Sequence, residues 1–301
     1  MNSSNKGSVL IISLIIMSIA TSLALFIIKI TKDITVSSSL ILEKLEAKIK
    51  AESEIERLKY LFLTGSFGFY SFKPGTFTKL YPQEIFLNGK EFAVDNDIKI
   101  SVVDTSSKIN LYIYTEEKRL KDVFKTILDK NKALILADTY LDWIDRDSFT
   151  RIAGAERDYY VKHTRYTPRN NIFMQDLEEL LNIKGYSQET YKHLKKYLTL
   201  SYTGGDINLF LVDNKLLNAL SFVNKATLDA IKNLKNTDRF KDLKKLIEKN
   251  SGLTEIFSLE PSKILEITVK AKSGNAVEKI YCIIDFKETE EKPCTVYKYK
   301  E

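Results

Sequence analysis

The chain has 301 residues with a formal net charge of +6, and hydrophobic residues make up 44% of it. That length is enough to bury one large or two modest hydrophobic cores. Its 40 acidic side chains interleave with 46 basic ones, which predicts a mixed, solvated surface and argues against a basic nucleic-acid-binding saddle. The low content of proline and glycine, with five and 11 residues, argues against a disordered linker protein.

The N-terminal segment contains the most informative feature of the sequence. Residues 8–28 carry no charge and are mostly apolar. As a helix this run would be ~31 Å long, about the thickness of a bilayer's hydrocarbon core. We therefore expect a single transmembrane helix over residues 8–28, with the rest of the chain working at the membrane surface.

Three interpretations of this N-terminus are open. A secretory signal peptide would be cut near the small residues Ala20 or Ala24, and a signal anchor would be retained. The sequence also resembles the leader of a type IV pilin-like protein, because a seven-residue peptide with one charge ends in Gly7 before Ser8. On this third interpretation residues 1–7 are a prepilin leader, cleavage falls between Gly7 and Ser8, and the bulk of the chain lies outside the cytoplasm.

The helical pattern continues beyond the apolar run. Residues 29–63 contain no proline or glycine. Their apolar positions recur at steps of three and four residues: Leu42, Leu45, Ile49, Ile55, Leu58, Leu61 and Phe62. We expect one continuous helix from Ser8 to about Leu63, whose second part, residues 29–63, is amphipathic.

Two groups of predicted strands flank a long helical region. In the first group, residues 84–94 form two strands around a turn at Asn88 and Gly89, and residues 98–103 and 109–114 continue an antiparallel sheet. The second group has the alternating or apolar patterns of strands, over residues 264–271, 278–286 and 295–299.

Helical periods fill the interval between the two groups. The expected helices are 120–128, 133–143, 176–181, 188–197, 216–219, 226–234 and 239–248. The sequence therefore predicts an α+β fold in which one sheet packs on the long helix and an all-helical domain is inserted between its strands. The predicted parts after the helix are residues 64–115 and 256–301 for the sheet and 116–255 for the insertion.

An acidic segment is the main candidate for chemistry. Five carboxylates fall within 17 residues: Asp142, Asp145, Asp147, Glu156 and Asp158. Calcium prefers six to eight oxygen ligands in a flexible cage, so such a cluster could hold it, although the spacing is not that of an EF-hand. Paired carboxylates could also perform acid–base chemistry. The third interpretation is a solvated loop neutralised by the neighbouring arginines.

Motifs for other chemistry are absent from the sequence. His163 and His193 are the only histidines, and neither neighbours a candidate nucleophile. There is no phosphate-binding loop, Gly-x-Ser-x-Gly or Cys-x-x-Cys motif, so we expect no enzymatic activity. Residues 177–197 resemble a helix-hairpin-helix unit that keeps one glycine, Gly185. A second, looser hairpin has none, so a packing scaffold is favoured over DNA binding.

Two cysteines, Cys282 and Cys294, lie close together in the segment expected outside the cytoplasm. A disulfide and two free buried thiols are both open.

Several motifs together resemble general secretion pathway protein K, the large minor pseudopilins of type II secretion. The most specific are 142–145 (Asp-Trp-Ile-Asp), 154–156 (Gly-Ala-Glu) with Tyr159 and Tyr160, 168–170 (Pro-Arg-Asn), the hairpin 177–185 with 197–199 (Tyr-Leu-Thr), and Ile207 with Asn208. The fifth mature position agrees too. Counted from Ser8 it is Ile12, where most pilin-like proteins carry Glu and this family characteristically lacks the acid. A buried carboxylate would seek the amino group of a neighbouring subunit, so a subunit without it suits a tip.

The resemblance implies a type IV pilin-like fold, a long N-terminal helix on an antiparallel sheet with an inserted helical domain. It implies cleavage and N-methylation by prepilin peptidase, and a tip complex with two other minor pseudopilins above the major pseudopilin. It also implies calcium in the helical region, with Asp145, Asp147, Glu156 and Asp158 as candidate ligands. One departure is Leu209-Phe-Leu in place of the Asn-Thr-Ala that usually follows the Ile-Asn pair.

The sequence thus predicts a structural, assembly-initiating subunit at the tip of a pseudopilus, anchored by one pass in the inner membrane with its bulk in the periplasm. No nucleic-acid partner is expected. One alternative is a tip or minor pilin of a type IV pilus or competence system. Two others are a membrane-anchored DNA-binding protein and a metal-dependent hydrolase that uses Glu156.

Overall fold

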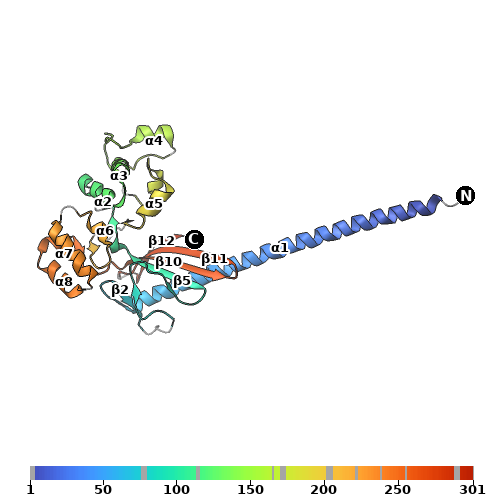
Figure 1. Cartoon of the computed structure of the whole chain (residues 1–301), viewed down its shortest axis with the longest axis horizontal. Coiled ribbons are helices and arrows are strands. Elements are labelled where there is room, and N and C mark those ends of the chain that lie inside the picture. Colours follow the sequence, from blue (N-terminus) through green and yellow to red (C-terminus); the bar gives the residue numbers. More distant parts are fainter. Residues whose placement is uncertain are drawn as a thin grey trace.

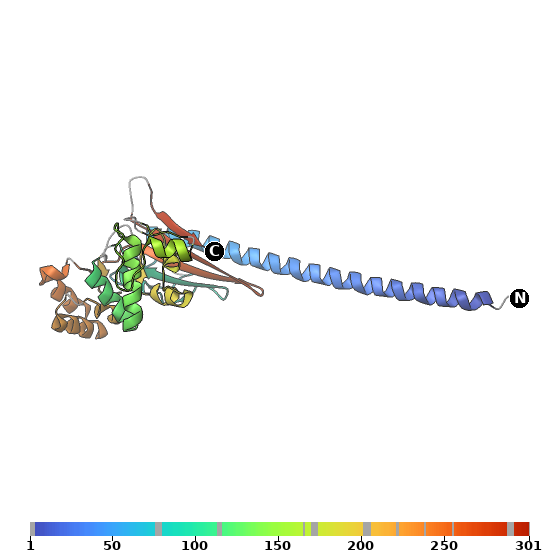
Figure 2. The ribbon, with the colours of Figure 1, turned by 90° about the horizontal axis from the view of Figure 1, so that it is seen from above.

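The computed structural model describes residues 4–75, 80–112, 116–164, 166–169, 174–200, 206–220, 223–237, 239–254, 256–287 and 292–300. A helix of 61 residues, α1 (Ser4–Thr64), runs out of a mixed head, and Figures 1 and 2 show its N-terminal part projecting alone. Its hydroxyl side chains bond back to the helix; Thr21 Oγ1 donates to the Met17 carbonyl and Ser13 Oγ to the Leu10 carbonyl. Such bonds satisfy the hydroxyls without water, as an apolar surrounding requires.

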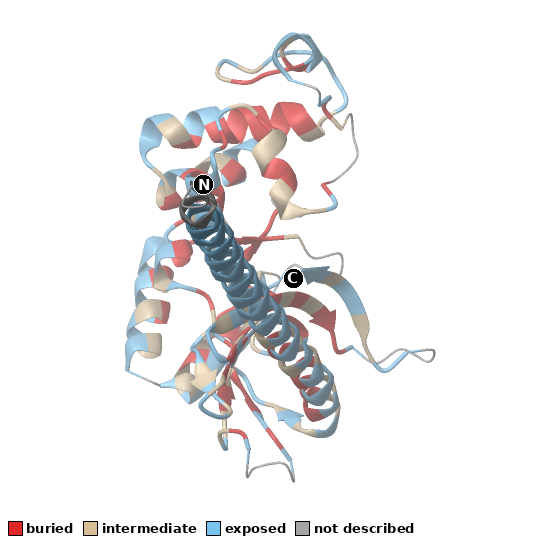
Figure 3. Cartoon of the chain, turned by 90° about the vertical axis from the view of Figure 1, so that its right-hand side faces the viewer, coloured by how far each residue is buried: buried red, intermediate tan, exposed pale blue. Residues whose placement is uncertain are grey.

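The two ends of α1 have opposite environments. Every large apolar side chain between Val9 and Ile28 is more than half exposed. Near the other end Ala51, Leu58 and Leu61 are buried, and Figure 3 shows this change from exposed to buried along the helix. The long helix predicted from Ser8 to about Leu63 is therefore confirmed, and its second part supplies one wall of the head's core.

The core on α1 is closed by a five-stranded antiparallel sheet in the order β12-β11-β10-β5-β4. Its strands are β4 (Phe92–Ala93), β5 (Ile98–Asp104), β10 (Ile264–Ser273), β11 (Ala276–Asp285) and β12 (Thr295–Lys300). Side chains alternate along β5, where Ile98, Ile100 and Val102 are buried, because one face of the sheet packs on the helix. Strands β5 and β10 are direct neighbours although more than 150 residues separate them, so the intervening chain is an insertion.

Two details of the first strand group were predicted wrongly. The turn at Asn88 and Gly89 does not join a hairpin, because β3 (Ile85–Phe86) pairs with β2 (Ser71–Lys73) and β4 pairs with β5. The short strand β1 (Ser66–Phe67) completes this second, three-stranded sheet. Of the strand predicted at 109–114, only β6 (Ile109–Asn110) forms, and it pairs outside the main sheet; residues 113 and 114 lie outside the described part.

The insertion is a block of helices, some of which lie above the sheet and others beside it in Figure 1. Its elements are η1 (Thr105–Ser107), α2 (Glu117–Ile127), α3 (Lys130–Ile144), α4 (Arg157–His163), η2 (Leu177–Asn182), α5 (Gln188–Leu194), α6 (Asn214–Leu217), α7 (Lys225–Asn236), α8 (Phe240–Glu248) and α9 (Ser251–Thr254). The helices α4 and α9 were not predicted. Two short parallel pairs, β6 with β7 (Leu198–Thr199) and β8 (Ile207–Asn208) with β9 (Phe257–Ser258), complement the helices. The pilin-like α+β arrangement is therefore as predicted, with these strand pairs added to the helical block.

The chain enters and leaves the block at one buried carboxylate, Asp104. Its Oδ1 accepts from the backbone N–H groups of Ser106 (2.9 Å) and Ser262 (3.1 Å) and from both serine hydroxyls. Its Oδ2 accepts from the Lys263 N–H at 3.1 Å. Because Asp104 ends β5 and Ser262 precedes β10, this residue fastens the two ends of the insertion to each other.

Replacing Asp104 with Ala should destabilise the head strongly. The change leaves three backbone donors without their acceptor, at a cost of about 2–4 kcal/mol. Urea unfolding of the full chain in non-ionic detergent measures this loss. The control is Asp97→Ala, which removes a half-exposed pair with Lys50 (2.8 Å) and should cost under about 1 kcal/mol. Equal losses in the two variants would show that Asp104 does not have this fastening role.

Candidate functional site

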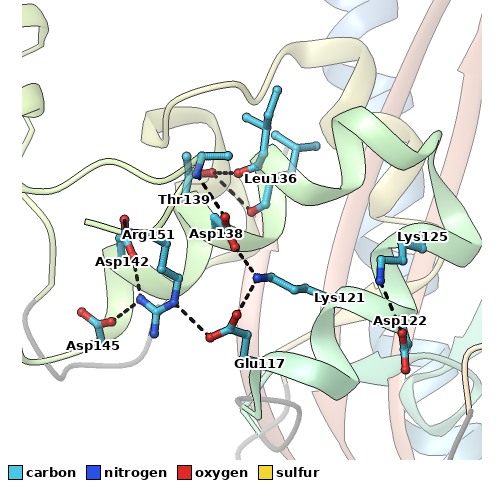
Figure 4. A network of polar contacts seen from close by, with 12 residues as sticks. Glu117, Lys121, Asp122, Lys125, Leu136, Asp138, Thr139, Asp142, Asp145 and Arg151 are labelled. Carbon is cyan, nitrogen blue, oxygen red and sulfur yellow. Dashed lines mark hydrogen bonds and ion pairs between the residues drawn. The ribbon is translucent and has the colours of Figure 1, made fainter. Parts of the chain in front are cut away.

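Carboxylates line one face of α3, at successive steps of four and three residues. They are Asp138, Asp142 and Asp145, and the last of these is the C-cap of the helix. The loop after the helix brings Glu156 to the same place, so that one oxygen each of Asp142, Asp145 and Glu156 lie within 4.8 Å of one another. Figure 4 shows the α3 part of this acidic cluster. Asp138, Asp142 and Glu156 are buried, and Asp145 is half-buried.

The loop between residues 151 and 156 is folded onto these carboxylates. The Arg151 N–H donates to Asp142 Oδ2 at 3.2 Å, and the Ala153 N–H donates to Asp138 Oδ2 at 3.1 Å. A Cβ atom on Gly154 would lie 1.8 Å from Asp142 Oδ2, so only glycine allows the loop to approach this closely. The resemblance motif at 154–156 therefore has a local physical reason.

Two cations pair with the cluster, because Lys121 Nζ lies 2.8 Å from Asp138 Oδ1 and Arg151 pairs with Asp142 and Asp145. One guanidinium nitrogen lies 2.6 Å from Asp142 Oδ1 and 2.6 Å from Asp145 Oδ2, and Nε lies 3.5 Å from Glu117 Oε2 (Figure 4). The interpretation of an acidic segment balanced by arginine is thus correct for Arg151. This interpretation is incomplete, because one carboxylate of the cluster forms no ion pair with Arg151.

That carboxylate is Glu156. Within the described part of the chain, its Oε1 atom and Asp145 Oδ1 are buried without a hydrogen-bond partner. Burial, followed by repulsion from Asp142 and Asp145, raises the pKa of the Glu156 carboxyl to about 7. Unpaired buried carboxylate oxygens that repel one another suit a hard divalent cation, which prefers oxygen ligands. Asp142, Asp145 and Glu156 therefore fit a calcium ion, and Arg151 would compete with it.

The four predicted ligands divide into two pairs. Asp145 and Glu156 belong to the cluster. Asp147 is exposed and its Oδ1 accepts from the Phe149 N–H at 2.8 Å, while Asp158 is exposed in the first turn of α4. Asp142 was missed as a ligand, although its spacing from Asp138 and Asp145 on a predicted helix would have placed the three on one face.

Other motif residues hold the block together. The Trp143 Nε1–H donates to Glu179 Oε1 at 2.9 Å, and Arg169 forms two bonds to the same carboxylate at 2.6 and 2.5 Å. Asn208 Nδ2 donates to the Phe69 carbonyl at 3.0 Å, which ties the block to the pilin-like part. These motif residues have structural roles; Asn170 lies outside the described residues.

The first helical hairpin packs inward at its glycine. Gly185 has φ +90°, a conformation that favours glycine, and a Cβ there would lie 3.1 Å from Leu136 Cδ2 of α3. Since this turn faces α3, its backbone is not presented to a phosphate. The second hairpin includes residue 222, which lies outside the described part.

Both histidines hydrogen-bond to backbone carbonyls. His163 Nδ1 lies 2.8 Å from the Tyr159 oxygen, and His193 Nε2 lies 3.1 Å from the Ile127 oxygen. Cys282 and Cys294 are free thiols, the first buried on β11 and the second half-buried before β12. The residue opposite Cys282 on β12 is Tyr299, so the register places Cys294 near the other end of that pair.

The predicted processing residues lie on the projecting part of α1. Gly7 and Ser8 are within its helical backbone, and Ile12 is 54% exposed. Among the described residues, one helix is long and apolar enough to cross a membrane, and none of its apolar window is buried. A single-pass anchor is the simplest role for it.

Comparisons with known proteins agree with this architecture. Residues 114–202 match the family model of type II secretion system (T2SS), protein K. Most of the fold is similar to a chain of the crystal structure of the GspK-GspI-GspJ complex from the enterotoxigenic Escherichia coli type 2 secretion system. That likeness has a TM-score of 0.58 at 14% sequence identity, and it covers 88% of this chain and 98% of the other. No curated protein matches the chain. The resemblance to protein K is confirmed for residues 114–202, and the pilin-like fold is confirmed for most of the chain.

Replacing Glu156 with Gln should stabilise the metal-free chain at high pH only. Between the usual glutamate pKa near 4.3 and about 7, the folded chain keeps a proton that the unfolded chain has released, so Glu156 lowers stability as the pH rises through that window. The variant should melt on the order of 3 °C above the original chain at pH 8 and equally at pH 4.5. Thermal unfolding in the presence of a chelator measures both values.

The matched control is Asp158→Asn, which removes an exposed acid in the first turn of α4, outside the cluster, so its effect on the melting temperature should be small and similar at both pH values. A variant at Glu156 that loses stability at pH 8 would contradict the assigned repulsion.

Proposed function

We propose that this chain is a minor pseudopilin of type II secretion, a structural subunit of the tip complex that starts pseudopilus assembly. One observation carries the proposal. The segment that matches protein K lies in a helical block inserted between β5 and β10 of a sheet packed on a long N-terminal helix. Both the family match and the position of the block are therefore those expected of such a subunit.

The projecting helix supports an assembly role. Its apolar residues 9–28 lack partners in the described chain, so in the bilayer they meet lipid and in a filament they meet the helices of other subunits. Small residues allow close helix approach, and Ser13, Ser18, Ala20 and Ser22 supply such positions. The proposed sequence of events is insertion, removal of residues 1–7 by prepilin peptidase, and side-by-side packing with the sister helices.

Ile12 supports the tip position. A carboxylate at that depth would require a partner amino group on a neighbouring subunit, since an unpaired charge in an apolar surrounding is costly. A subunit with isoleucine there makes no such demand. The proposed partners are two other minor pseudopilins, as in the similar complex, and the major pseudopilin below them; the head would stand in the periplasm.

A structural role without turnover is consistent with the side chains. Both histidines hydrogen-bond to backbone carbonyls, and Arg151 pairs with Asp142 and Asp145. The DNA-binding alternative has less support because Gly185 turns toward α3. The pilus or competence alternative shares the anchor and differs in its genetic neighbours.

The test of the function is processing and export in cells. In a strain that lacks its own protein K, this chain should restore export, and its mature form should begin at N-methylated Ser8 when prepilin peptidase is present. Gly7→Val should block cleavage and export, because the peptidase requires a small residue at the cut. Mass analysis of the N-terminus and the amount of exported protein measure the two effects.

The control is Asn5→Ala, which changes the leader away from the cut and should leave both results unchanged. An intact Met1 in cells with the peptidase, or a cut after Ala24, would rule out the proposal. Restoration of export by residues 29–301 alone would do so as well.

We also propose that Asp142, Asp145 and Glu156 bind calcium, which would supply a positive charge that cross-links α3 to the loop after it. Binding to the folded chain alone raises stability by ~2.7 kcal/mol at 100 times the dissociation constant, or on the order of 5 °C in melting temperature. Calcium should give this shift at pH 7.5 in the original chain and in Asp147→Asn. It should give none in Asp145→Asn or Glu156→Gln, and equal shifts in all four chains would reject the site.

A further inference from the structure

A groove of about 850 Å³ lies between α5 and the face of the main sheet that points away from α1. Five lysines line it: Lys108, Lys192, Lys195, Lys196 and Lys279. The carboxylates in its wall are Asp213 and Glu266. The groove therefore has an excess of three positive charges from three separate parts of the fold.

One lysine is already neutralised. Lys108 Nζ lies 2.7 Å from Glu266 Oε2, and both side chains are buried. Asp213 is occupied in a different way, because its Oδ1 accepts from the Lys215 N–H at 2.7 Å as the N-cap of α6. Within the described ranges, none of the other four lysines has a carboxylate within 4.0 Å.

Of these four lysines, Lys195 packs closely on the sheet and has a perturbed pKa. Its ammonium lies 4.0 Å from the centroid of the Tyr281 ring and is half-buried. Burial lowers the pKa of Lys195, and the charges of Lys298 and Lys108 add to this effect, although Glu266 opposes it. Glu178 opposes it as well, so two glutamates and two lysines act on this ammonium. An incoming anion would offset the cost of burying the cation.

Helix stability alone does not explain the arrangement. Lys192 and Lys195 lie at the C-terminal end of α5, where cations interact well with the helix dipole. Lys279, however, lies on β11, two residues from Tyr281 and therefore on the same face of the sheet. Two unrelated elements thus direct ammonium groups to one groove, whose remaining lining includes Tyr191, Tyr197, Tyr281, Val103, Leu211 and Leu216.

We infer that this groove binds an extended acidic segment of a partner protein, with carboxylates on the lysines and aliphatic or peptide groups on the tyrosines. The inference rests on the proposed function, because the partner would belong to the same secretion assembly. Charge complementarity of this kind steers association and fixes the orientation of partners more than it adds affinity.

An anionic membrane is a less suitable occupant. The helix between Ile28 and Glu43 spans ~22 Å, and the β10 strand from Ser273 back to Glu266 adds ~23 Å. The turn after Ser273 lies against Glu43 of α1, whose carboxylate accepts from the Asn275 N–H at 2.8 Å. The strand therefore begins where this stretch of helix ends, and the two lengths add. The groove is then several Debye lengths of ~8 Å from the lipid headgroups, beyond their electrostatic attraction.

The first experiment measures binding of a fluorescein-labelled hexaglutamate peptide to the full chain in non-ionic detergent, by fluorescence anisotropy. The groove variant is Lys192→Gln/Lys196→Gln/Lys279→Gln. The matched control is Lys225→Gln/Lys241→Gln/Lys249→Gln, three exposed lysines of the α7–α8 region. Both variants lose three charges. The groove variant should bind about tenfold more weakly, since three exposed ion pairs of ~0.5 kcal/mol sum to one decade, and the control should bind within about twofold of the original chain.

Equal weakening in both variants, or no binding by the original chain, overturns the inference. A groove variant that instead loses binding to vesicles containing phosphatidylglycerol, while keeping peptide binding, assigns the groove to lipid and overturns it too.

The second experiment uses the same two variants in cells. Export and co-purification with the two other minor pseudopilins should fall in the groove variant and persist in the control. If the groove variant keeps both while the original chain is cleaved at Ser8 and supports export, the inference fails and the proposed function stands. If the original chain itself is not cleaved or does not support export, the proposed function fails.

Discussion

The structure depends on one helix, α1, whose two parts require different surroundings. The apolar side chains of residues 9–28 face outward on every side, which is stable only in lipid or among similar helices. The same helix then buries Ile55, Leu58 and Leu61 under the sheet. Two carboxylates at the transition, Glu43 and Glu46, accept bonds from Asn275 N–H and Ser273 Oγ at 2.8 and 2.7 Å. The turn between β10 and β11 is thereby fastened where the helix leaves the head.

The insertion is compatible with this frame because its two ends meet. The Asp104 carboxylate closes the loop from β5 to β10, and the buried pair between Lys108 and Glu266 adds a second link just above it. Removing one partner of such a pair typically costs about 3–5 kcal/mol, since the other charge stays buried. The strand β6 at the start of the block pairs with β7 in its middle, and β8 in its middle pairs with β9 at its end, so each end of the block is joined to its middle. The helical block is therefore attached to the sheet at one place, between β5 and β10.

Helices and strands long enough to show a clear hydrophobic period made most of the fold predictable from the sequence. The helix of α1, the helices α2, α3 and α7, and the strands β10 and β11 all have clear periods over ten or more residues. Pairing was less predictable, because two-residue strands such as β3 and β6 carry too little pattern to specify a partner. Sequence periodicity also says nothing about parallel neighbours that are about ninety residues apart, as Ile109 and Leu198 are.

The acidic cluster was likewise only partly predictable from the sequence. Composition located the acidic segment, but two of the predicted ligands, Asp147 and Asp158, lie outside the cluster, and Asp142 lies within it. Glu156 joins the cluster only through the close approach at Gly154, which depends on tertiary packing. The sequence also could not predict which carboxylates Arg151 pairs with, since an arginine in a loop can reach several of them.

The arginine sets the electrostatic properties of the cluster. One guanidinium pairs with two of the three carboxylates, and burial together with repulsion from those two raises the pKa of the third, Glu156, to about 7. A divalent cation brings twice that charge in a smaller volume, and it gains most when Glu156 is ionised. If calcium binds as proposed, its binding would be weakened by the two ion pairs of Arg151 that it must replace, and strengthened as Glu156 loses its proton with rising pH. The attachment of one loop would then be coupled to both the proton and the cation concentration around the head.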